Sequence, residues 1–390
     1  ERMQPLFSSE ADYNEFKNRH AKHQVPVGDL ASYRGNAYLG IDAGSTTTKA
    51  ALVGEDGTLL YSFYHGNDGD PLGTTIGAIK DIYSQLPEGV QIVHSCSTGY
   101  GEALIKAALL LDEGEVETVS HYYAASFFEP DVDCILDIGG QDMKCIKIKN
   151  QTVDSVQLNE ACSSGCGSFI ETFAKSLNYT VEDFAHEALF AKHPIDLGTR
   201  CTVFMNSGII TEQRNGRTSE DIMAGLCRSI IENVFTKVIR VSNLDSLGKK
   251  IVVQGGTFEN DAVLRAMEEY VGRDVVRAPY PGIMGAIGMA LIAKEKYEKS
   301  PETEEIWDLQ NLDTFSYTQD ANSPCPFCGN HCNRTIVKFS NGNSWVTNNR
   351  CERGEVIGNP KDKEVNRQVK EKLQKVNAVP NLYKIREELL

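Results

Sequence analysis

The chain has 390 residues, of which 41% are hydrophobic and 24% charged, and it carries a formal net charge of −15. This length exceeds what one hydrophobic core usually covers, so we expect two or three folded units. The negative charge argues against nucleic acid or an anionic membrane as the main partner, and no apolar run approaches the roughly 18 residues of a membrane span.

The N-terminal segment, residues 1–35, is polar and predicts a helix followed by a connector that is broken near Pro26. It lacks the apolar core of a signal peptide. It opens on Glu1 rather than methionine, which is compatible with a piece of a longer polypeptide. From residue 36 onwards, strands and helices alternate. The pattern predicts a hairpin over 38–53, strands near 59–64 and 90–96, and helices near 71–86, 101–111 and 118–127.

Two hairpin signatures, 95 residues apart, carry most of the information. In each, an apolar strand ends at an aspartate, Asp42 or Asp137, and a tight glycine turn leads into a second strand. Glycine lets backbone N–H groups approach a polyphosphate, hydroxyls add donors, and the aspartate can hold Mg²⁺ or its waters. Two such turns predict a duplicated fold that clamps a nucleotide from both sides. The candidate binding residues in these turns are Gly44, Ser45, Thr46, Thr47, Lys49, Gly139, Gly140, Gln141 and Asp142.

The following part, up to residue 294, repeats this alternation loosely. We expect helices at 164–177, 180–190, 217–243 and 259–271, strands at 250–254 and 274–277, and a helix of small residues after Pro281. Gly255 and Gly256, between a strand and a helix, would let the chain pass flat against an adenine or ribose. The glycines of the last helix, Gly285 among them, indicate close packing against the sheet or the nucleotide.

The C-terminal part differs in composition. Residues 295–323 predict a linker, 324–358 a cysteine-rich module, and 359–390 a charged helical tail that is solvated or faces a partner. The module contains Cys325, Cys328, Cys332 and Cys351, whose spacing is typical of metal ligands. A zinc ion and a [4Fe–4S] cluster both fit this spacing, and His331 could replace one ligand. We favour a structural metal knuckle over an electron relay.

The remaining cysteines have simpler interpretations. An odd total of eleven without a signal peptide argues against a disulfide framework and favours a reducing, cytoplasmic location. Four of them are predicted to be small buried hydrophobic residues, namely Cys96, Cys134, Cys145 and Cys227. Taken on residues alone, Cys162 and Cys201, which are 39 positions apart, would be interpreted in the same way.

The order of the motifs, two phosphate hairpins and then an adenosine turn, resembles the superfamily of actin, sugar kinases and Hsp70. That resemblance implies an α/β, duplicated ribonuclease H-like fold, with subdomains 36–155 and 156–294 around a cleft for ATP or ADP and Mg²⁺. Within the superfamily, the BadF/BadG/BcrA/BcrD family is the most similar, on the segments 137–142, 159–165, 201–204 and 281–286. This family comprises ATP-dependent activators of 2-hydroxyacyl-CoA dehydratases and ATPase subunits of benzoyl-CoA reductase. The resemblance spans residues 37–294.

The resemblance carries functional expectations. It implies a homodimer, or a pairing with a second activator-like module, that shares one [4Fe–4S] cluster through Cys162 and Cys201 of each protomer. ATP hydrolysis at Asp42 and Asp137 would drive a low-potential electron from reduced ferredoxin or flavodoxin to an iron–sulfur dehydratase or reductase. The resemblance also implies that Gly285 contacts the nucleotide.

Three features need separate comment. Glu117 and His121 match a family pattern, and we expect them near the sheet rather than in catalysis. Cys166 departs from the short activators, and we expect a small residue tolerated in a tight turn. Short activators also lack the C-terminal cysteine module, which resembles extended activator-like proteins.

Two other functions stay open on the sequence. One is a small-molecule kinase of the same superfamily, which would need a substrate pocket but no cluster. The other is a scaffold without a cluster that uses the nucleotide as an interaction switch. Iron and sulfide analysis of protein purified without oxygen would separate these alternatives from an activator.

Overall fold

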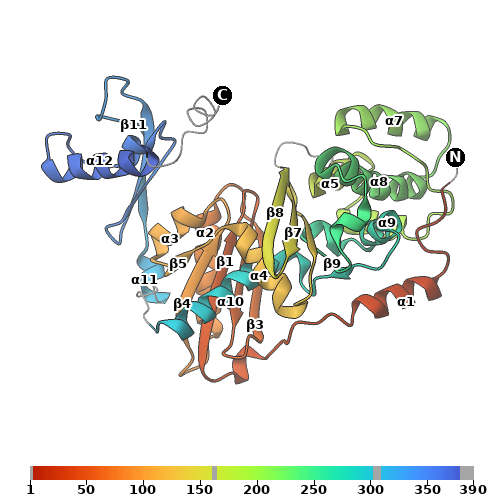
Figure 1. Cartoon of the computed structure of the whole chain (residues 1–390), viewed down its shortest axis with the longest axis horizontal. Helices are drawn as coiled ribbons and strands as arrows, with labels where there is room; N and C mark the ends of the chain where they lie inside the picture. The colour runs from red at the N-terminus through yellow and green to blue at the C-terminus, as the bar shows by residue number, and fades with distance from the viewer. Residues whose placement is uncertain (1–2, 160–164, 302–308, 378–390) are drawn as a thin grey trace. The chain divides into compact units, whose positions relative to one another are not determined.

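A computed structural model describes residues 3–159, 165–301 and 309–377 of the chain (Figure 1). The described residues form two compact units. The first contains 3–103 and 111–301, and the second contains 104–110 and 309–377.

Two five-stranded sheets with the same topology form the framework of the first unit. In the first sheet the order is β3-β2-β1-β4-β5, built from β1 (Asn36–Ala43), β2 (Thr47–Val53), β3 (Leu59–Gly66), β4 (Gln91–Thr98) and β5 (Glu113–Gly114). In the second the order is β10-β9-β6-β7-β8, built from β6 (Cys134–Ile138), β7 (Met143–Lys149), β8 (Thr152–Asn159), β9 (Ile251–Gln254) and β10 (Val276–Arg277). Each sheet has three antiparallel strands followed by two parallel ones. The predicted duplication is therefore confirmed.

Helices accompany both sheets. The first half contains α1 (Glu10–His20), α2 (Pro71–Gln85), α3 (Glu102–Leu109) and α4 (Glu117–Phe128). The second contains α5 (Gly167–Ser176), α6 (Val181–Ala188), α7 (Thr202–Arg214), α8 (Ser219–Asn233), α9 (Asp261–Val271) and α10 (Met284–Lys299). Polar side chains cap several N-termini, as Thr180, Thr218 and Asn260 do for α6, α8 and α9. None of the helices in the described part of the chain combines the length and apolar character that a membrane span requires.

Some elements differ from the sequence predictions. The helix expected over 217–243 is α8 followed by a π-helical turn at 234–239, which ends at Arg240 with a left-handed φ of 54°. Helix α7 and strand β8 were not expected. Much of β8 is exposed on both faces, so its sequence lacks the alternation of a half-buried strand.

The central strands of the second sheet, β6 and β9, are buried on both faces, and the alternation along β6 explains how. Cys134, Leu136 and Ile138 of β6 pack in one core with the helices of the second half, whereas Ile135 packs in the other core with α4 and α10. Successive side chains of a strand point to opposite faces, so one strand serves both cores. The aspartate at the end of β6 is therefore held by a rigid support.

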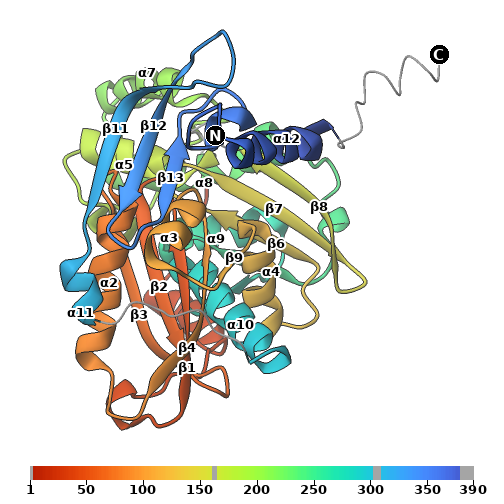
Figure 2. The ribbon, with the colours of Figure 1, turned by 90° about the vertical axis from the view of Figure 1, so that its left-hand side faces the viewer.

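Helix α10 is the small-residue helix that the sequence predicted, and it packs closely on both neighbours. It lies along β1, β2 and β4 of the first sheet and against α4, and Figure 2 shows the strands of this sheet between α2 and α10. At Gly288, an added Cβ would stand 2.1 Å from the carbonyl oxygen of Ser120 on α4. Only glycine permits this approach, so the expected close packing is confirmed.

We expect Gly288→Ala to destabilise the protein by about 1–3 kcal/mol, because the methyl group forces α10 and α4 apart. Chemical denaturation followed by circular dichroism would measure it. Gly77→Ala on the exposed face of α2 is the matched control, since no atom lies within 4 Å of the added methyl group. That variant should gain about 0.5–1 kcal/mol from helix propensity. Equal stability changes in the two variants would contradict the packing argument.

The second unit is built on a three-stranded antiparallel sheet, β11 (Tyr317–Pro324), β12 (Asn333–Phe339) and β13 (Ser344–Thr347), in that order. It also contains α11 (Leu309–Thr314) and α12 (Lys363–Asn377). The prediction of a linker over 295–323 was wrong in its described part, since the end of α10, α11 and most of β11 fall there. Nearly every residue of β11 is exposed, which explains the missing apolar pattern.

Candidate functional site

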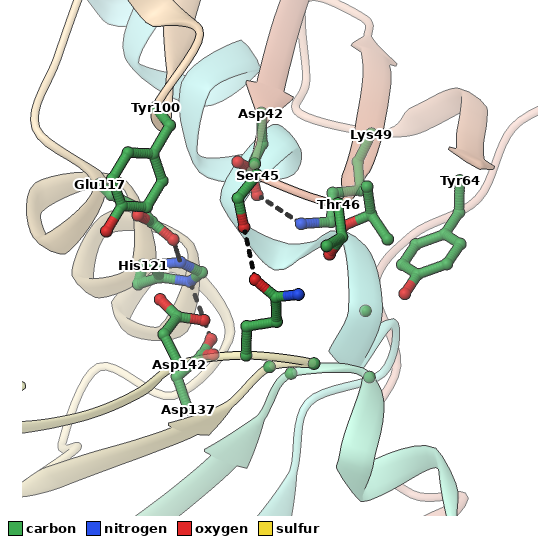
Figure 3. A pocket seen from close by; sticks show the side chains of 18 of the residues that line it. Asp42, Ser45, Thr46, Lys49, Tyr64, Tyr100, Glu117, His121, Asp137 and Asp142 are labelled. Carbon is green, nitrogen blue, oxygen red and sulfur yellow. Dashed lines mark hydrogen bonds and ion pairs between the residues drawn. The ribbon is translucent and has the colours of Figure 1, made fainter. Parts of the chain in front are cut away.

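The two aspartate hairpins face each other across one cavity (Figure 3). Asp42 comes from the end of β1 and Asp137 from β6, and the hydroxyl of Ser45 donates across the cavity to Gln141 Oε1 at 3.5 Å. Of the nucleotide-site residues predicted from sequence, all but one line this cavity. They are Asp42, Gly44, Ser45, Thr46, Thr47, Lys49, Asp137, Gly139, Gly140, Gln141, Asp142, Gly255 and Gly256.

Gly285 is the exception, because it does not line the cavity. It lies behind Asp42, where an added Cβ would stand 2.5 Å from the Oδ2 atom of that aspartate. Gly285 packs closely against this carboxylate, and its contact with the nucleotide stays a prediction. Gly285 therefore lets helix α10 begin directly against Asp42.

The turns have the same geometry in both halves. The amide of Gly44 donates to the Thr47 carbonyl at 2.9 Å, and the amide of Gly139 donates to the Asp142 carbonyl at 2.9 Å. The third turn is different, since Gly255 has a φ of 91° and its missing Cβ would stand 2.3 Å from the Ile138 carbonyl oxygen. A side chain would fit neither this conformation nor this space. The strand–glycine turn is thus held against the end of β6.

Each hairpin also pairs its aspartate with a lysine across the strands. Asp42 faces Lys49 in the register of β1 and β2, and Asp137 faces Lys144 in the register of β6 and β7. The Nζ atom of Lys49 lies 3.3 Å from Asp42 Oδ2. Burial opposes the charge of Lys49, but Asp42, together with Tyr64, Asp137 and Glu117, outweighs burial and raises the pKa of this lysine. Lys49 lines the cavity, whereas Lys144 is not among its lining residues.

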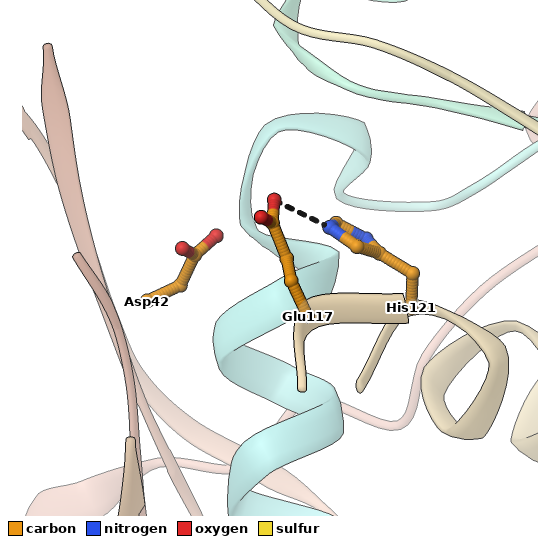
Figure 4. A group of neighbouring side chains, drawn as sticks. All are labelled: Asp42, Glu117 and His121. Atoms are coloured by element: carbon orange, nitrogen blue, oxygen red, sulfur yellow. Dashed lines mark hydrogen bonds and ion pairs between the residues drawn. The ribbon is translucent and has the colours of Figure 1, made fainter. Parts of the chain in front are cut away.

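Three side chains that could hold a metal ion lie together in the lining of the cavity (Figure 4). The ligand atoms of Asp42, Glu117 and His121 all lie within 4.8 Å of one another. Asp42 Oδ1 is buried and has no hydrogen-bond partner among the described residues. A buried oxygen without a partner is costly unless a cation or water reaches it. Two carboxylates at this point suit Mg²⁺, which prefers oxygen ligands.

Glu117 and His121, which the sequence placed near the sheet rather than in catalysis, both line the cavity. His121 Nε2 lies 3.2 Å from Glu117 Oε1, and its Nδ1 lies 3.1 Å from Asp137 Oδ2 and 2.6 Å from the Gln254 amide nitrogen. Burial disfavours the charged imidazole, but Asp137 and Glu117 outweigh this effect and raise the pKa of His121. Their spacing of four residues on one helix was the available sign that they act together.

Glu117 is held as a carboxylate. Burial would raise its pKa, but the hydrogen bond and charge of His121, with Lys144 Nζ at 2.9 Å, lower the pKa of Glu117 well below its ordinary range. Burial opposes the charge of Lys144 in turn, yet Asp137, Glu117 and Asp142 together raise the pKa of that lysine. The cluster therefore keeps its charges at neutral pH.

The sequence analysis missed three contributors to this site. Lys144 could have been found from the duplication, because it occupies the position of Lys49 in the second hairpin. Tyr64 and Tyr100 line the cavity with 51% and 67% of their surface exposed, so they stand at its mouth. No local sequence signal marks either tyrosine.

A second cavity, of about 500 Å³, adjoins the first and shares Tyr64, Gly140 and Gly256 with it. Residues of α5, α6 and the turn after Gly255 form most of its walls. Tyr13 of the N-terminal helix α1 completes the wall, and its hydroxyl donates to Asp261 Oδ2 at 2.6 Å.

The cysteines separate into buried and exposed ones. Cys96, Cys134, Cys145 and Cys227 are buried, as predicted, and so is Cys166 at the N-cap of α5. Cys201 is exposed at the N-cap of α7. Cys162 lies outside the described residues. Cys325, Cys328, Cys332 and Cys351 belong to the second unit and are described below.

Two sheets of equal topology, each presenting an aspartate hairpin to one shared cavity, define the fold class of the actin-like ATPases and sugar kinases. The model of the BadF/BadG/BcrA/BcrD ATPase family matches residues 39–293. The chain therefore belongs to that family of ATPases. The N-terminal helix α1 and the second unit's residues 309–377 lie outside the matched segment.

Named relatives are dehydratase activators. The chain is 32% identical over 266 residues to the (R)-2-hydroxyglutaryl-CoA dehydratase activating ATPase of Acidaminococcus fermentans, which covers 67% of this chain and 98% of the relative. The crystal structure of component A of that organism's dehydratase has a TM-score of 0.61 and 29% identity, covering 68% of this chain and 100% of the other. The 2-hydroxyisocaproyl-CoA dehydratase activator of Clostridium difficile with bound ADPNP has a TM-score of 0.61 and 25% identity, covering 70% and 99%.

Proposed function

We propose that this protein is an ATP-hydrolysing iron–sulfur activator that delivers low-potential electrons to a partner of the 2-hydroxyacyl-CoA dehydratase or benzoyl-CoA reductase type. The observation that carries the proposal is the pair of matching Asp–Lys hairpins across one cavity, in a chain of this ATPase family. Relatives named as dehydratase activators suggest the class of acceptor. Reduced ferredoxin or flavodoxin would be the electron donor.

The cavity offers a place for each part of MgATP. The phosphates would lie between the two glycine turns, with Lys49 and the backbone N–H groups as donors. Asp42 and Glu117 would hold the magnesium ion, directly or through water. Asp137, fixed by Gln254 and His121, faces the same space and would orient the attacking water. The adjoining cavity beside Gly256 would take the nucleoside.

The proposed shared cluster requires thiolates at the surface of the protomer. Cys201 fits, because its exposed side chain stands at the N-terminus of the 13-residue helix α7. Phe204 and Ile210 of α7 are 69% and 41% exposed, and a second protomer would cover apolar side chains of this kind. With Cys162 as the other ligand, two protomers would supply four thiolates. A [4Fe–4S] cluster held there would provide a one-electron centre.

A direct connection links the phosphate hairpin to the segment that carries Cys162. The amides of Gly167 and Ser168, at the start of α5, donate to the carbonyls of Gly139 and Gly140 at 2.8 and 2.7 Å. A nucleotide-dependent shift of the second hairpin would therefore pull on α5. ATP can change the cluster environment only if it binds the two shapes with different affinity.

Purification without oxygen, followed by ATPase, iron, sulfide and oligomer measurements, tests the proposal. We expect Mg²⁺-dependent ATP hydrolysis, a dimer that contains iron and sulfide, and ATP-dependent reduction of a low-potential acceptor. An iron-free protein that phosphorylates a small molecule would overturn the proposal in favour of a kinase. ATP hydrolysis without any electron transfer would instead favour a scaffold that uses the nucleotide as an interaction switch.

The placement of the nucleoside gives a separate prediction for Tyr13. Tyr13→Ala should weaken ATP binding about three- to tenfold, because a partly buried aromatic wall contributes on the order of 1 kcal/mol. Tyr13→Phe keeps the ring and loses only the bond to Asp261, so its affinity should stay near that of the wild type. Isothermal titration calorimetry with a non-hydrolysable ATP analogue would compare them. Equal affinities in all three proteins would place the nucleoside elsewhere.

A further inference from the structure

In the second unit, three cysteines between β11 and β12 and one cysteine after β13 line one small space. Cys325 directly follows β11, Cys328 and Cys332 lie in the loop before β12, and Cys351 follows β13. All four line this space, together with Arg334, Asn349, Arg350 and Gly354. The amide of Cys325 donates to the Cys332 carbonyl at 2.9 Å, so the backbone holds the loop closed.

A buried cation in this lining has a donor that nothing satisfies. Arg334 is only 4% exposed, and its Nη1 atom donates to the carbonyls of Gly354 and Val356. Its Nε is buried and has no hydrogen-bond partner among the described residues. A guanidinium always carries its charge, and leaving its donor unpaired in a buried site costs free energy. Neutral thiols are weak acceptors, so a negatively charged group is the appropriate neighbour for Arg334.

We propose that Cys325, Cys328, Cys332 and Cys351 are the thiolate ligands of a metal centre that belongs to the second unit, and that this centre is a [4Fe–4S] cluster. Metal binding keeps all four thiols deprotonated, and the resulting negative charge is the partner that Arg334 lacks. Arg350 adds a second positive charge in the lining. The inference does not depend on the proposed function, because these residues are not part of the ATPase cavity.

The sulfur spacing favours an iron–sulfur cluster over a single zinc ion. In a tetrahedral zinc site with Zn–S bonds of about 2.3 Å, the sulfurs lie roughly 3.8 Å apart. Among the described residues, Asp42, Glu117 and His121 are the one group of three or more whose ligand atoms lie within 4.8 Å of each other. The four cysteine sulfurs do not form such a group. They therefore surround the space more widely than a single zinc ion requires. A cubane places its thiolates on separate irons and accepts the wider spacing.

His331 is not needed as a ligand. Its Nδ1 lies 3.3 Å from the carbonyl oxygen of Cys325, and its backbone has a left-handed φ of 43° that turns the loop. His331→Ala is therefore a control that changes the same loop and leaves the four thiols in place.

Metal analysis of the full chain, purified without oxygen, tests the inference. In the Cys201→Ser background, which removes the proposed shared cluster, we expect iron and sulfide equal to one cubane per chain. Adding Cys325→Ser and Cys332→Ser should remove that iron, whereas adding His331→Ala should retain it. One zinc per chain without iron would overturn the iron–sulfur assignment. Unchanged iron after loss of Cys325 and Cys332 would overturn the site.

A measurement without substitutions protects the test against misfolded variants. In the untreated full-length chain, all four cysteines should resist alkylation, and mass spectrometry should find them modified after the metal is extracted. Cys351, which is exposed, is the most informative of the four. Its rapid alkylation in metal-loaded protein would overturn the proposal.

Discussion

Asp42→Asn is expected to lower Mg²⁺-dependent ATP hydrolysis by roughly a hundredfold or more. The loss of a group that stabilises the transition state directly typically lowers a rate by this much. The asparagine keeps the shape of the side chain but not its charge. Asp42 is buried, one of its oxygens has no hydrogen-bond partner within the described part of the chain, and the other faces Lys49 at 3.3 Å. The substitution therefore removes a proposed magnesium ligand and leaves the lysine without its counterion.

The same result is expected for Asp137→Asn, and for a different reason. Asp137 accepts from the Gln254 amide at 3.2 Å and faces His121 at 3.1 Å, so it would hold the attacking water rather than the metal. Steady-state ATPase rates across a magnesium titration distinguish the two cases. Excess magnesium should partly restore the Asp42 variant and should not restore the Asp137 variant.

Asp56→Asn is the matched control, because Asp56 is an exposed carboxylate in the turn between β2 and β3 and does not line the cavity. Its turnover should equal that of the wild type. If the Asp42 and Asp137 variants also hydrolyse ATP at the normal rate, the phosphate site lies elsewhere.

Cys201→Ser should abolish the shared cluster and with it all ATP-dependent electron delivery, while nucleotide binding remains. A serine hydroxyl is not deprotonated at neutral pH and does not replace a thiolate on iron. Cys201 caps α7 without a side-chain hydrogen bond, so the substitution removes no internal contact of the cap. Iron per dimer, the electron paramagnetic resonance signal of the reduced protein, and acceptor reduction measure the loss.

Asn206→Ala serves as the comparison, since Asn206 is an exposed residue on the same helix. It should keep both iron and electron transfer. Because the second unit is proposed to hold its own cubane, iron in the Cys201 variant should fall only by the share of the bridging cluster. Full retention of iron and of acceptor reduction would show that Cys201 is not a ligand.

The sequence predicted those parts of the site that lie in short contiguous motifs. The hairpins at Asp42 and Asp137 consist of an apolar strand, a glycine turn and a second strand, so their conformation is decided locally. The position of Glu117 and His121 at the cavity could not be predicted from the sequence, because it depends on packing between α4 and α10, which are distant in sequence. Helix α7 and strand β11 were missed because both are largely exposed, and periodicity reveals only elements that bury one face.

The N-terminal helix has a practical consequence for anyone who would shorten this chain. Leu6, Phe7 and Phe16 are buried in the core of the second half, and Arg19 forms two bonds to Glu268 at 2.7 and 2.6 Å. A recombinant fragment that begins at residue 39, where the family match starts, would lack these side chains. It would expose the core positions that they cover and leave the buried Glu268 without its arginine partner. Such a fragment should aggregate. ATPase measurements on this protein should therefore use a chain that begins at residue 3 or earlier.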